Sequence, residues 1–330
     1  MFGLSWITCL WSGLPRLWWR GDGRALLERK HGVCQNAHCL HSAWGCLHVC
    51  DYCNIGTFLN IMVNLEELVE RLDPLLDANT WQQLYKYDNQ TDTITFEPEY
   101  GASALMVGFF ARREREYLLL YTKSNNVDHL LDLDHRGHTI VSCTVSSDTV
   151  TRLVEKHSPR TSERVEGLRK LQTAGYPVRA RFSPIVPIKG WREDNAAMIR
   201  ELCSTVELDV LTIDILGLLG YDRLAECFDL ELLDPEYVAL SKALYEGEPR
   251  GKPFWPAGKQ MFPHEARATV YRFVLDRVRE VDPELPVSFC DETPEMWAEF
   301  GPELKSGTPA NYVCTCGPDS VPGNPLLRSA

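Results

Sequence analysis

After about residue 39, two patterns of apolar residues alternate along this chain. One is a short apolar run, and the other is the recurrence of apolar residues at helical spacing. Short apolar runs predict strands at residues 39–44, 93–96, 117–122, 139–145, 178–185 and 210–216. Apolar positions at helical spacing predict helices at residues 65–76, 103–114, 126–133, 194–206, 221–227, 235–245 and 263–281. Asn64 with Glu67 predicts a capping box at the first helix, and a further helix is predicted from Ser162, as its cap, to Gly175.

This alternation of strands and helices predicts an α/β fold built from parallel βα units. Six units over residues 39–220 fit an open, partial barrel better than the complete barrel of eight. After residue 220 the pattern loosens into short helices, a loop at 248–262, one long helix and a short strand at 287–290. This predicts a C-terminal α+β extension over residues 221–330. Residues 1–38 show no clear period and are predicted to be an N-terminal extension.

The composition is that of a globular protein and narrows the range of partners. The chain has 330 residues, of which 44% are hydrophobic and 24% charged. Its net charge of -12 excludes a protein that coats nucleic acid with a generally basic surface, so a nucleic-acid partner requires a local basic path. There is no apolar run of about 18 residues and no basic start to a signal peptide. We therefore expect a cytoplasmic protein with no membrane partner.

The cysteines are the unusual part of the composition, because there are 12 of them and three lie within eight residues. The segment Cys46-Leu-His-Val-Cys50-Asp-Tyr-Cys53 has the spacing C-x3-C-x2-C. Thiolates are soft ligands that suit iron–sulfur clusters, and three of them leave one iron of a four-iron cluster open. The alternative is a zinc site with a fourth ligand from Cys34, Cys39 or His48.

The order of several motifs adds a family resemblance. The loop resembles the cluster loop of the radical S-adenosylmethionine superfamily, and the wider chain resembles the spore photoproduct lyase family. The matching segments are Gly45-Cys-Leu-His-Val-Cys-Asp-Tyr-Cys53, Val63-Asn-Leu-Glu-Glu67, Lys123, Asn126-Val-Asp-His-Leu-Leu131, His135-Arg-Gly-His-Thr139, Ala174-Gly-Tyr176, Ser183-Pro-Ile185, Gly190-Trp191 and Gly258-Lys259. The resemblance covers about residues 41–316.

The resemblance implies a partial (β/α)6 barrel of the radical SAM type, with a C-terminal extension. It implies a 4Fe-4S cluster and S-adenosyl-L-methionine, whose one-electron cleavage makes a 5′-deoxyadenosyl radical. It also implies a lyase that repairs a thymine dimer in DNA, with flavodoxin or ferredoxin as electron donor; a damaged base leaves the stack at lower cost. The implied roles are cluster ligation by Cys46, Cys50 and Cys53, hydrogen relay by Tyr52, and cofactor binding by Lys123, Thr144 and Ser146.

Some residues depart from the family pattern or have more than one interpretation. The segment Phe96-Glu-Pro-Glu-Tyr-Gly-Ala-Ser103 has no cysteine where the family places a hydrogen donor, and Cys143 would replace it only if it faces the barrel. Cys314 and Cys316 suit metal binding, redox chemistry or a structural role. Alternative functions are therefore a radical enzyme for another substrate, such as a modified RNA base or small molecule, and a non-catalytic metal-binding relative. Candidate phosphate contacts are Lys252, Lys259, Arg267 and Arg272.

Overall fold

The computed structural model describes residues 32–328 except 36, 54, 57, 218–220 and 248–260. Most of the predicted N-terminal extension and of the predicted loop at 248–262 therefore lies outside the described residues, together with Lys252 and Lys259.

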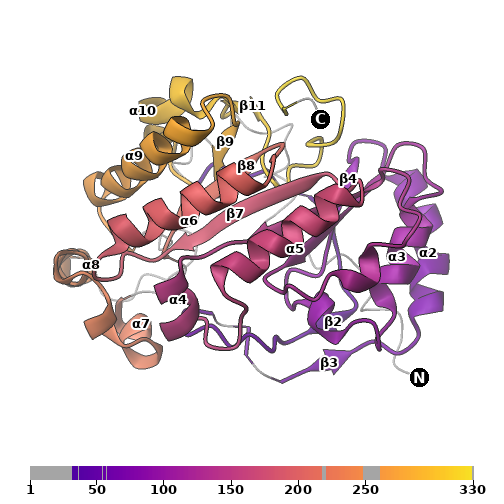
Figure 1. The fold of residues 1–330 in the computed structure, drawn as a ribbon, viewed down its shortest axis with the longest axis horizontal. Coiled ribbons are helices and arrows are strands. Elements are labelled where there is room, and N and C mark those ends of the chain that lie inside the picture. Colours follow the sequence, from indigo (N-terminus) through magenta and orange to yellow (C-terminus); the bar gives the residue numbers. More distant parts are fainter. Residues whose placement is uncertain are drawn as a thin grey trace.

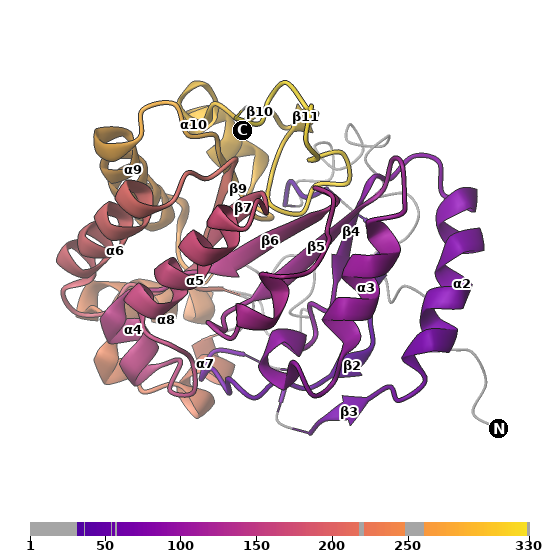
Figure 2. The same ribbon diagram turned by 45° about the vertical axis from the view of Figure 1, so that its right-hand side comes forward.

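A parallel sheet of seven strands organises the described part of the chain, in the order β1-β4-β5-β6-β7-β8-β9. Figures 1 and 2 show it as a curved sheet with helices along one face. Its strands are β1 (Cys39–Leu40), β4 (Leu84–Tyr87), β5 (Tyr117–Thr122), β6 (Thr139–Thr144), β7 (Val178–Ile185), β8 (Leu211–Ile215) and β9 (Val287–Phe289). The α/β partial barrel predicted from the sequence is confirmed.

The strand predicted at 39–44 contributes only Cys39–Leu40 to this sheet, and the second predicted strand is wrong. Residues 93–96 form a 3₁₀ helix, η3 (Thr93–Phe96), rather than a strand, and the second strand of the barrel is β4. The turn closes because Thr95 donates through both its backbone N–H and its hydroxyl to the carbonyl oxygen of Asp92. The pattern of β4 conceals a strand because Lys86 interrupts its apolar run, and only the barrel interior explains a half-buried lysine at this position.

Helices follow most strands, close to their predicted positions, except that the short helix at 148–153 was not predicted. They are α2 (Leu65–Ala78), α3 (Ala102–Phe110), α4 (Asp148–Leu153), α5 (Thr161–Thr173), α6 (Trp191–Thr205), α7 (Tyr221–Cys227), α8 (Pro235–Gly247), α9 (His264–Val281) and α10 (Pro294–Leu304). The helix predicted at 126–133 shortens to a 3₁₀ turn, η4 (Asp128–Leu130), and a second such turn is η5 (Leu230–Leu232).

The two predicted helix caps have different outcomes, because Asn64 is the N-cap residue of α2 but forms no capping box, whereas Ser162 is not a cap. The side chain of Asn64 makes no cap hydrogen bond to the backbone of α2; it donates to the carboxylate of Glu67 at 2.8 Å. Ser162 lies inside α5, which begins one residue earlier after Arg160 as its cap.

Alternate residues of each strand divide between the two faces of the sheet. Val141, Cys143 and Ala180 belong to the main core, which the strands share with helix residues such as Leu168. Leu119, Ile140 and Tyr121 face the other side and meet Val321 of the C-terminal tail in a smaller cluster. The sheet is thus covered by helices outside and partly filled by the tail inside, as buried parallel strands require.

The segment predicted as a C-terminal extension takes part in the same sheet. β9 pairs with β8 in parallel, and α9 packs beside α6 on the helical face, as Figure 1 shows. Two small antiparallel pairs complete the fold: β2 (Ala43–Trp44) with β3 (Asn60–Ile61), and β10 (Gly307–Thr308) with β11 (Asn311–Tyr312). In the part of the chain that is described, no helix is both long and apolar enough to cross a membrane.

Candidate active site

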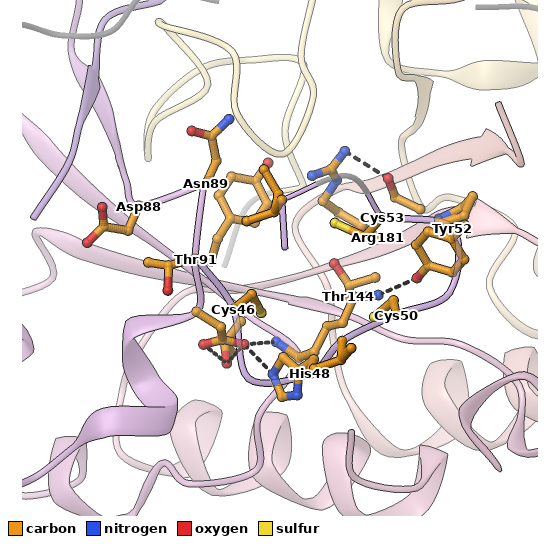
Figure 3. Close-up of a pocket in the computed structure, with 18 of the residues that line it drawn as sticks. Cys46, His48, Cys50, Tyr52, Cys53, Asp88, Asn89, Thr91, Thr144 and Arg181 are labelled. Atoms are coloured by element: carbon orange, nitrogen blue, oxygen red, sulfur yellow. Dashed lines mark hydrogen bonds and ion pairs between the residues drawn. The ribbon is translucent and has the colours of Figure 1, made fainter. Parts of the chain in front are cut away.

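A cavity of about 270 Å³ opens at the carboxyl ends of the central strands, where barrel enzymes assemble their active sites. Cys46, Cys50 and Cys53 line it together with Tyr52, as Figure 3 shows. The strand ends contribute Lys123 after β5, Thr144 of β6, Arg181 and Ser183 of β7, and Asp214 of β8. The loop and the strand ends thus face one space.

The backbone of the cysteine loop turns all three thiols toward this cavity. Gly45 has φ of +93°, and a Cβ atom there would lie 2.3 Å from the carbonyl oxygen of Phe58, so only glycine fits. The backbone N–H of Cys46 donates to the Gly56 oxygen at 3.1 Å, and that of Cys53 donates to the Cys50 oxygen at 2.9 Å. The loop is closed at its base and turned tightly between its last two cysteines.

His48 anchors this loop instead of pointing to the thiols. Its ring nitrogens lie 3.1 Å from the carbonyl oxygen of His157 and 2.8 Å from the carboxylate of Asp92. Asp92 is buried and also accepts hydrogen bonds from the hydroxyl of Thr122 and the backbone N–H of Lys123. The loop is therefore tied to the end of β5 through one carboxylate.

The described residues favour a multi-iron cluster over zinc. Among them, no three His, Cys, Asp or Glu side chains are grouped so as to hold a single metal ion. His48 is occupied by other partners, and Cys39 lies beside Lys86 and Cys316, away from the loop thiols. A tetrahedral zinc needs four ligands around one point. Three thiols around one cavity fit a cluster in which each binds a separate iron.

Cys46 and Cys50 are protonated at neutral pH without a metal. Burial raises the pKa of Cys46 to about 11 and that of Cys50 to about 12, the latter against the opposing charge of Lys123. A bound metal must displace these protons, because thiolate is the ligand.

Glu155 is the centre of a buried network beside the loop. Lys123 donates from Nζ to Glu155 Oε1 at 2.7 Å and to the Tyr52 hydroxyl oxygen at 3.0 Å. The Tyr52 hydroxyl itself donates to Glu155, and Arg164 donates to Glu155 Oε2 at 2.6 Å. Ser146 completes the network, with its hydroxyl 2.9 Å from Glu155 Oε1.

The two cations keep Glu155 ionised in a fully buried position. Burial alone would raise its pKa, but Lys123 and Arg164 outweigh burial and hold the pKa well below its usual value. Burial and the adjacent Glu155 carboxylate raise the pKa of Tyr52 far above that of a free phenol. Tyr52 therefore stays a neutral hydrogen-bond donor.

The residues predicted to bind the cofactor take different positions. Lys123 and Thr144 line the cavity, as predicted for cofactor contacts. Ser146 points to Glu155 and is absent from the cavity wall, so it acts through the network. The roles of Lys123, Thr144 and Ser146 in cofactor binding stay predictions.

Cys143 does not face the barrel. Its neighbour Thr144 lines the cavity, and successive residues of a strand point to opposite faces. Cys143 packs in the main core under the helices and is 2% exposed. This position excludes it as the replacement for the missing hydrogen-donor cysteine.

Two of the predicted phosphate contacts are already paired with carboxylates of the protein. Arg267 is buried and bonds the carboxylate of Glu292 at 2.8 Å. Arg272 is paired with Glu303 on the surface between α9 and α10. The sequence pattern missed Asp92 and Arg181, which line the cavity, and Glu155 and Arg164 of the adjacent network, because each becomes functional only through distant partners.

Comparisons with known proteins agree with this site. The family model described as spore photoproduct lyase matches residues 33–218. The spore photoproduct lyase of Bacillus subtilis is 26% identical over 184 residues, which are 51% of each chain. That of Geobacillus is 24% identical over 185 residues, covering 53% of this chain and 54% of the relative. The chain thus spans about half the length of the curated relatives it matches.

Solved structures show the same fold. A spore photoproduct lyase variant solved with bound AdoMet and dinucleoside spore photoproduct has a TM-score of 0.63 at 18% identity, covering 78% of this chain and 76% of that one. A spore photoproduct lyase complexed with the dinucleoside has a TM-score of 0.62 and covers 75% and 74%. The family model matches more than half of the chain, and this chain belongs to the spore photoproduct lyase family.

Proposed function

We propose that this chain is a radical S-adenosylmethionine lyase that repairs a thymine lesion in DNA. The observation that carries the proposal is the set of three thiols, Cys46, Cys50 and Cys53, on one loop that faces the strand ends of a partial barrel. The family membership and the relatives solved with AdoMet and spore photoproduct support it.

In this proposal Cys46, Cys50 and Cys53 hold a 4Fe-4S cluster. The cluster and S-adenosylmethionine, when bound and reduced by flavodoxin or ferredoxin, would supply a 5′-deoxyadenosyl radical. Lys123 offers the cation on the cavity wall that suits the carboxylate of the cofactor. Thr144 offers a hydroxyl next to it.

Tyr52 has the position of a residue that can lose an electron and a proton together. Its hydroxyl donates to Glu155, so the proton has an acceptor at the moment the phenol is oxidised. Lys123 keeps that carboxylate in place through its own bond to Glu155 Oε1. The hydrogen-relay role of Tyr52 is thus supported by its bonds, whereas Ser146 is a positioning residue.

DNA contact in an acidic protein requires local positive charge at the mouth of the cavity. Lys189 and Arg192 are exposed in and after the loop that follows β7, at the same end of the barrel as the cavity. Lys123 and Arg181 continue this charge into the cavity. A lesion swung out of the stack would meet these cations in turn.

Reconstitution of the full chain with iron and sulfide under anaerobic conditions tests the class of enzyme. We expect a four-iron spectrum and 5′-deoxyadenosine on reduction with dithionite in the presence of S-adenosylmethionine. Cys50→Ala should abolish both, while the matched change Cys227→Ala, on α7, should alter neither. A chain that binds no iron, or cleaves no cofactor, is instead the non-catalytic metal-binding relative.

Incubation with dinucleoside spore photoproduct then tests the substrate. Recovery of thymine residues together with 5′-deoxyadenosine supports the lesion lyase. Cofactor cleavage with no thymine recovered contradicts it and favours another substrate, such as a modified RNA base or a small molecule. The missing cysteine in residues 96–103 is the observation that keeps this second function in view.

A further inference from the structure

A second group of thiols lies inside the barrel, and the proposed radical chemistry does not use it. The C-terminal tail enters the barrel from the end opposite the cysteine loop, where Pro318 O accepts the backbone N–H of Leu84 at 2.9 Å. Thr315 is fully buried; its N–H donates to the Thr212 hydroxyl at 2.9 Å and its carbonyl accepts from Arg179 at 3.1 Å. The tail is therefore held firmly against the inner face of the sheet.

The tail carries Cys314 and Cys316 on one turn. The backbone N–H of Gly317 donates back to the Cys314 oxygen at 3.4 Å, and the two thiols are hydrogen-bonded to each other. A Cβ atom at Gly317 would lie 2.4 Å from the Gln35 side chain and 3.4 Å from Cys314 Sγ, so glycine keeps this turn compact. Cys314 is buried, whereas Cys316 is partly exposed.

Two cations and a phenol surround this pair. Tyr121 lies between Lys86 and Arg181, whose charged groups are 5.6 Å and 5.0 Å from the centre of its ring. Both cations interact with Cys316, and Tyr121 shares a hydrogen bond with it. Soft nucleophiles are activated in such electropositive surroundings.

The two thiols differ in protonation because of these neighbours. The hydrogen bond from Cys314, with Lys86 and Arg181, holds the pKa of Cys316 well below that of a free thiol. The same hydrogen bond and burial raise the pKa of Cys314. Titratable and charged groups that face the pair are Cys39 of β1, Lys86 of β4, Tyr121 of β5, Arg181 of β7, Tyr312 of β11, and Cys34.

We propose that Cys314 and Cys316 form a redox-active dithiol that reacts with low-molecular-weight disulfides, with Cys316 as attacking thiolate and Cys314 as resolving thiol. A partly exposed thiol and a buried thiol that share one turn and are hydrogen-bonded to each other are what such a pair needs. No group of three ligands for a single metal ion is found among the described residues, so the tail thiols are not assigned to zinc. The proposal is independent of the radical chemistry.

The reaction balances in two exchanges. The thiolate of Cys316 attacks one sulfur of the disulfide, forms a mixed disulfide and releases one thiolate. Cys314 then loses its proton to solvent and attacks Cys316 Sγ, which forms the Cys314–Cys316 disulfide and releases the second thiolate. The protein gives up two electrons, and the external disulfide is reduced to two thiols.

Oxidation of the tail thiols would change the charge beside the cavity wall. Tyr121 and Arg181 line the cavity, and Cys316 is hydrogen-bonded to Tyr121 and interacts electrostatically with Arg181. Oxidation removes the negative charge that faces Arg181 and leaves this cation with fewer anionic partners.

The test is to treat the anaerobically reconstituted full chain with hydroxyethyl disulfide and to map the cysteines by mass spectrometry. Cleavage after Lys305 and Arg328 yields a peptide whose only cysteines are Cys314 and Cys316. In the unaltered chain we expect this peptide to lose the mass of two hydrogen atoms, which reduction with dithiothreitol restores. Cys314→Ser should instead trap hydroxyethyl thiol on Cys316, and Cys316→Ser should leave the peptide unreacted. Cys203→Ser, on α6, should behave as the unaltered chain.

The proposal is overturned if the peptide stays reduced in the unaltered chain, or if Cys314→Ser gains no adduct while its circular dichroism is unchanged. A disulfide that links either thiol to Cys34 or Cys39 would also refute the assigned pair. So would iron or zinc bound by the tail in a variant with Cys46, Cys50 and Cys53 all changed to Ala. None of these readouts depends on S-adenosylmethionine cleavage.

Discussion

The barrel interior holds two groups of cysteines whose surroundings differ. In the cysteine loop Lys123 acts on Cys50, and Lys123 is itself paired with the Glu155 carboxylate at 2.7 Å. In the tail, Lys86 and Arg181 both act on Cys316 directly. Burial therefore prevails in the loop and raises the pKa of Cys50 to about 12, while hydrogen bonding and cations prevail in the tail and lower the pKa of Cys316.

The difference teaches that burial and the charges around a thiol together decide its protonation. At Cys50 burial is the main cause of the raised pKa, with Lys123 opposing it and Glu155 adding to it, so this thiol keeps its proton until a metal replaces it. At Cys316 the hydrogen bond and the two cations outweigh burial, so this thiol is ready to react as a thiolate.

The largest expected effect comes from removing the carboxylate. Glu155→Gln leaves Lys123 and Arg164 buried without an anion, which should lower the free energy of unfolding by about 3–5 kcal/mol. Urea denaturation of the full chain measures it. Glu166→Gln breaks an exposed ion pair with Arg169 and should leave the urea concentration at the midpoint of unfolding unchanged. Equal midpoints for both variants would contradict the role of Glu155 as the centre of the network.

The same carboxylate predicts the acid limit of stability. The pKa of Glu155 is lowered in the folded state, so its contribution is complete above its unfolded pKa of about 4.3 and is lost as the pH falls further. Denaturation measured from pH 7 downward should show this loss in the unaltered chain and a smaller loss in Glu155→Gln.

The pH profile of alkylation compares the two groups of thiols directly. In the metal-free chain, Cys316 should react with iodoacetamide at pH 7 and change little up to pH 9, because its pKa is already low. Cys50 should react more slowly by about tenfold or more and gain rate with each pH unit, since its pKa is about 12. Cys203, with a pKa also raised to about 12 by burial, serves as the control. If the alkylation rates of Cys316 and Cys50 changed with pH in parallel, the two groups of thiols would not differ in protonation as expected.

Removal of a single cation should make the reactivity of Cys316 in the tail more like that of the loop thiols. Lys86→Met keeps the length of the side chain and removes its charge, so the pKa of Cys316 should rise and its alkylation at pH 7 should slow severalfold. Lys305→Met, which breaks only an exposed pair with Glu284, should leave the rate as it was. A rate that does not respond to Lys86 would assign the low pKa to the Cys314 hydrogen bond and Arg181 alone.

The smallest effect should come from the phenol of the loop. Tyr52→Phe removes the hydroxyl that donates to Glu155 but leaves the bond between Lys123 and Glu155 intact. The free energy of unfolding should therefore fall by about 1 kcal/mol. Cluster binding, followed by its visible absorption, should persist. Loss of the cluster in Tyr52→Phe would show that the network supports the loop more strongly than one hydrogen bond.

Most of the fold could be predicted from local pattern. Residues 117–122 and 178–185 were predicted as strands with the observed bounds, because the first is an apolar run and the second alternates apolar and polar residues over most of its length. β4 was missed, since Lys86 is compatible with a strand only when the interior of the barrel supplies Tyr121 and thiols as partners. The error at residues 93–96 has a similar origin, because a turn around Asp92 overrides their β-branched composition.

The site could be predicted only where its residues are close in sequence. Cys46, Cys50 and Cys53 are recognisable from their spacing, which also places them on one loop. Glu155 follows a short helix with no motif around it, and its partners Tyr52 and Lys123 are 103 and 32 residues away. No periodicity in a single sequence reports such contacts.

The sequence by itself determined the α/β alternation and the three-cysteine loop, because both depend on neighbours along the chain. Only the tertiary structure decided which face Cys143 takes, which carboxylate neutralises Lys123, and which cations meet Cys316. The physical reason is that charge and protonation depend on distance through space and on burial. The folded barrel brings the loop, the strand ends and the tail into one low-dielectric interior.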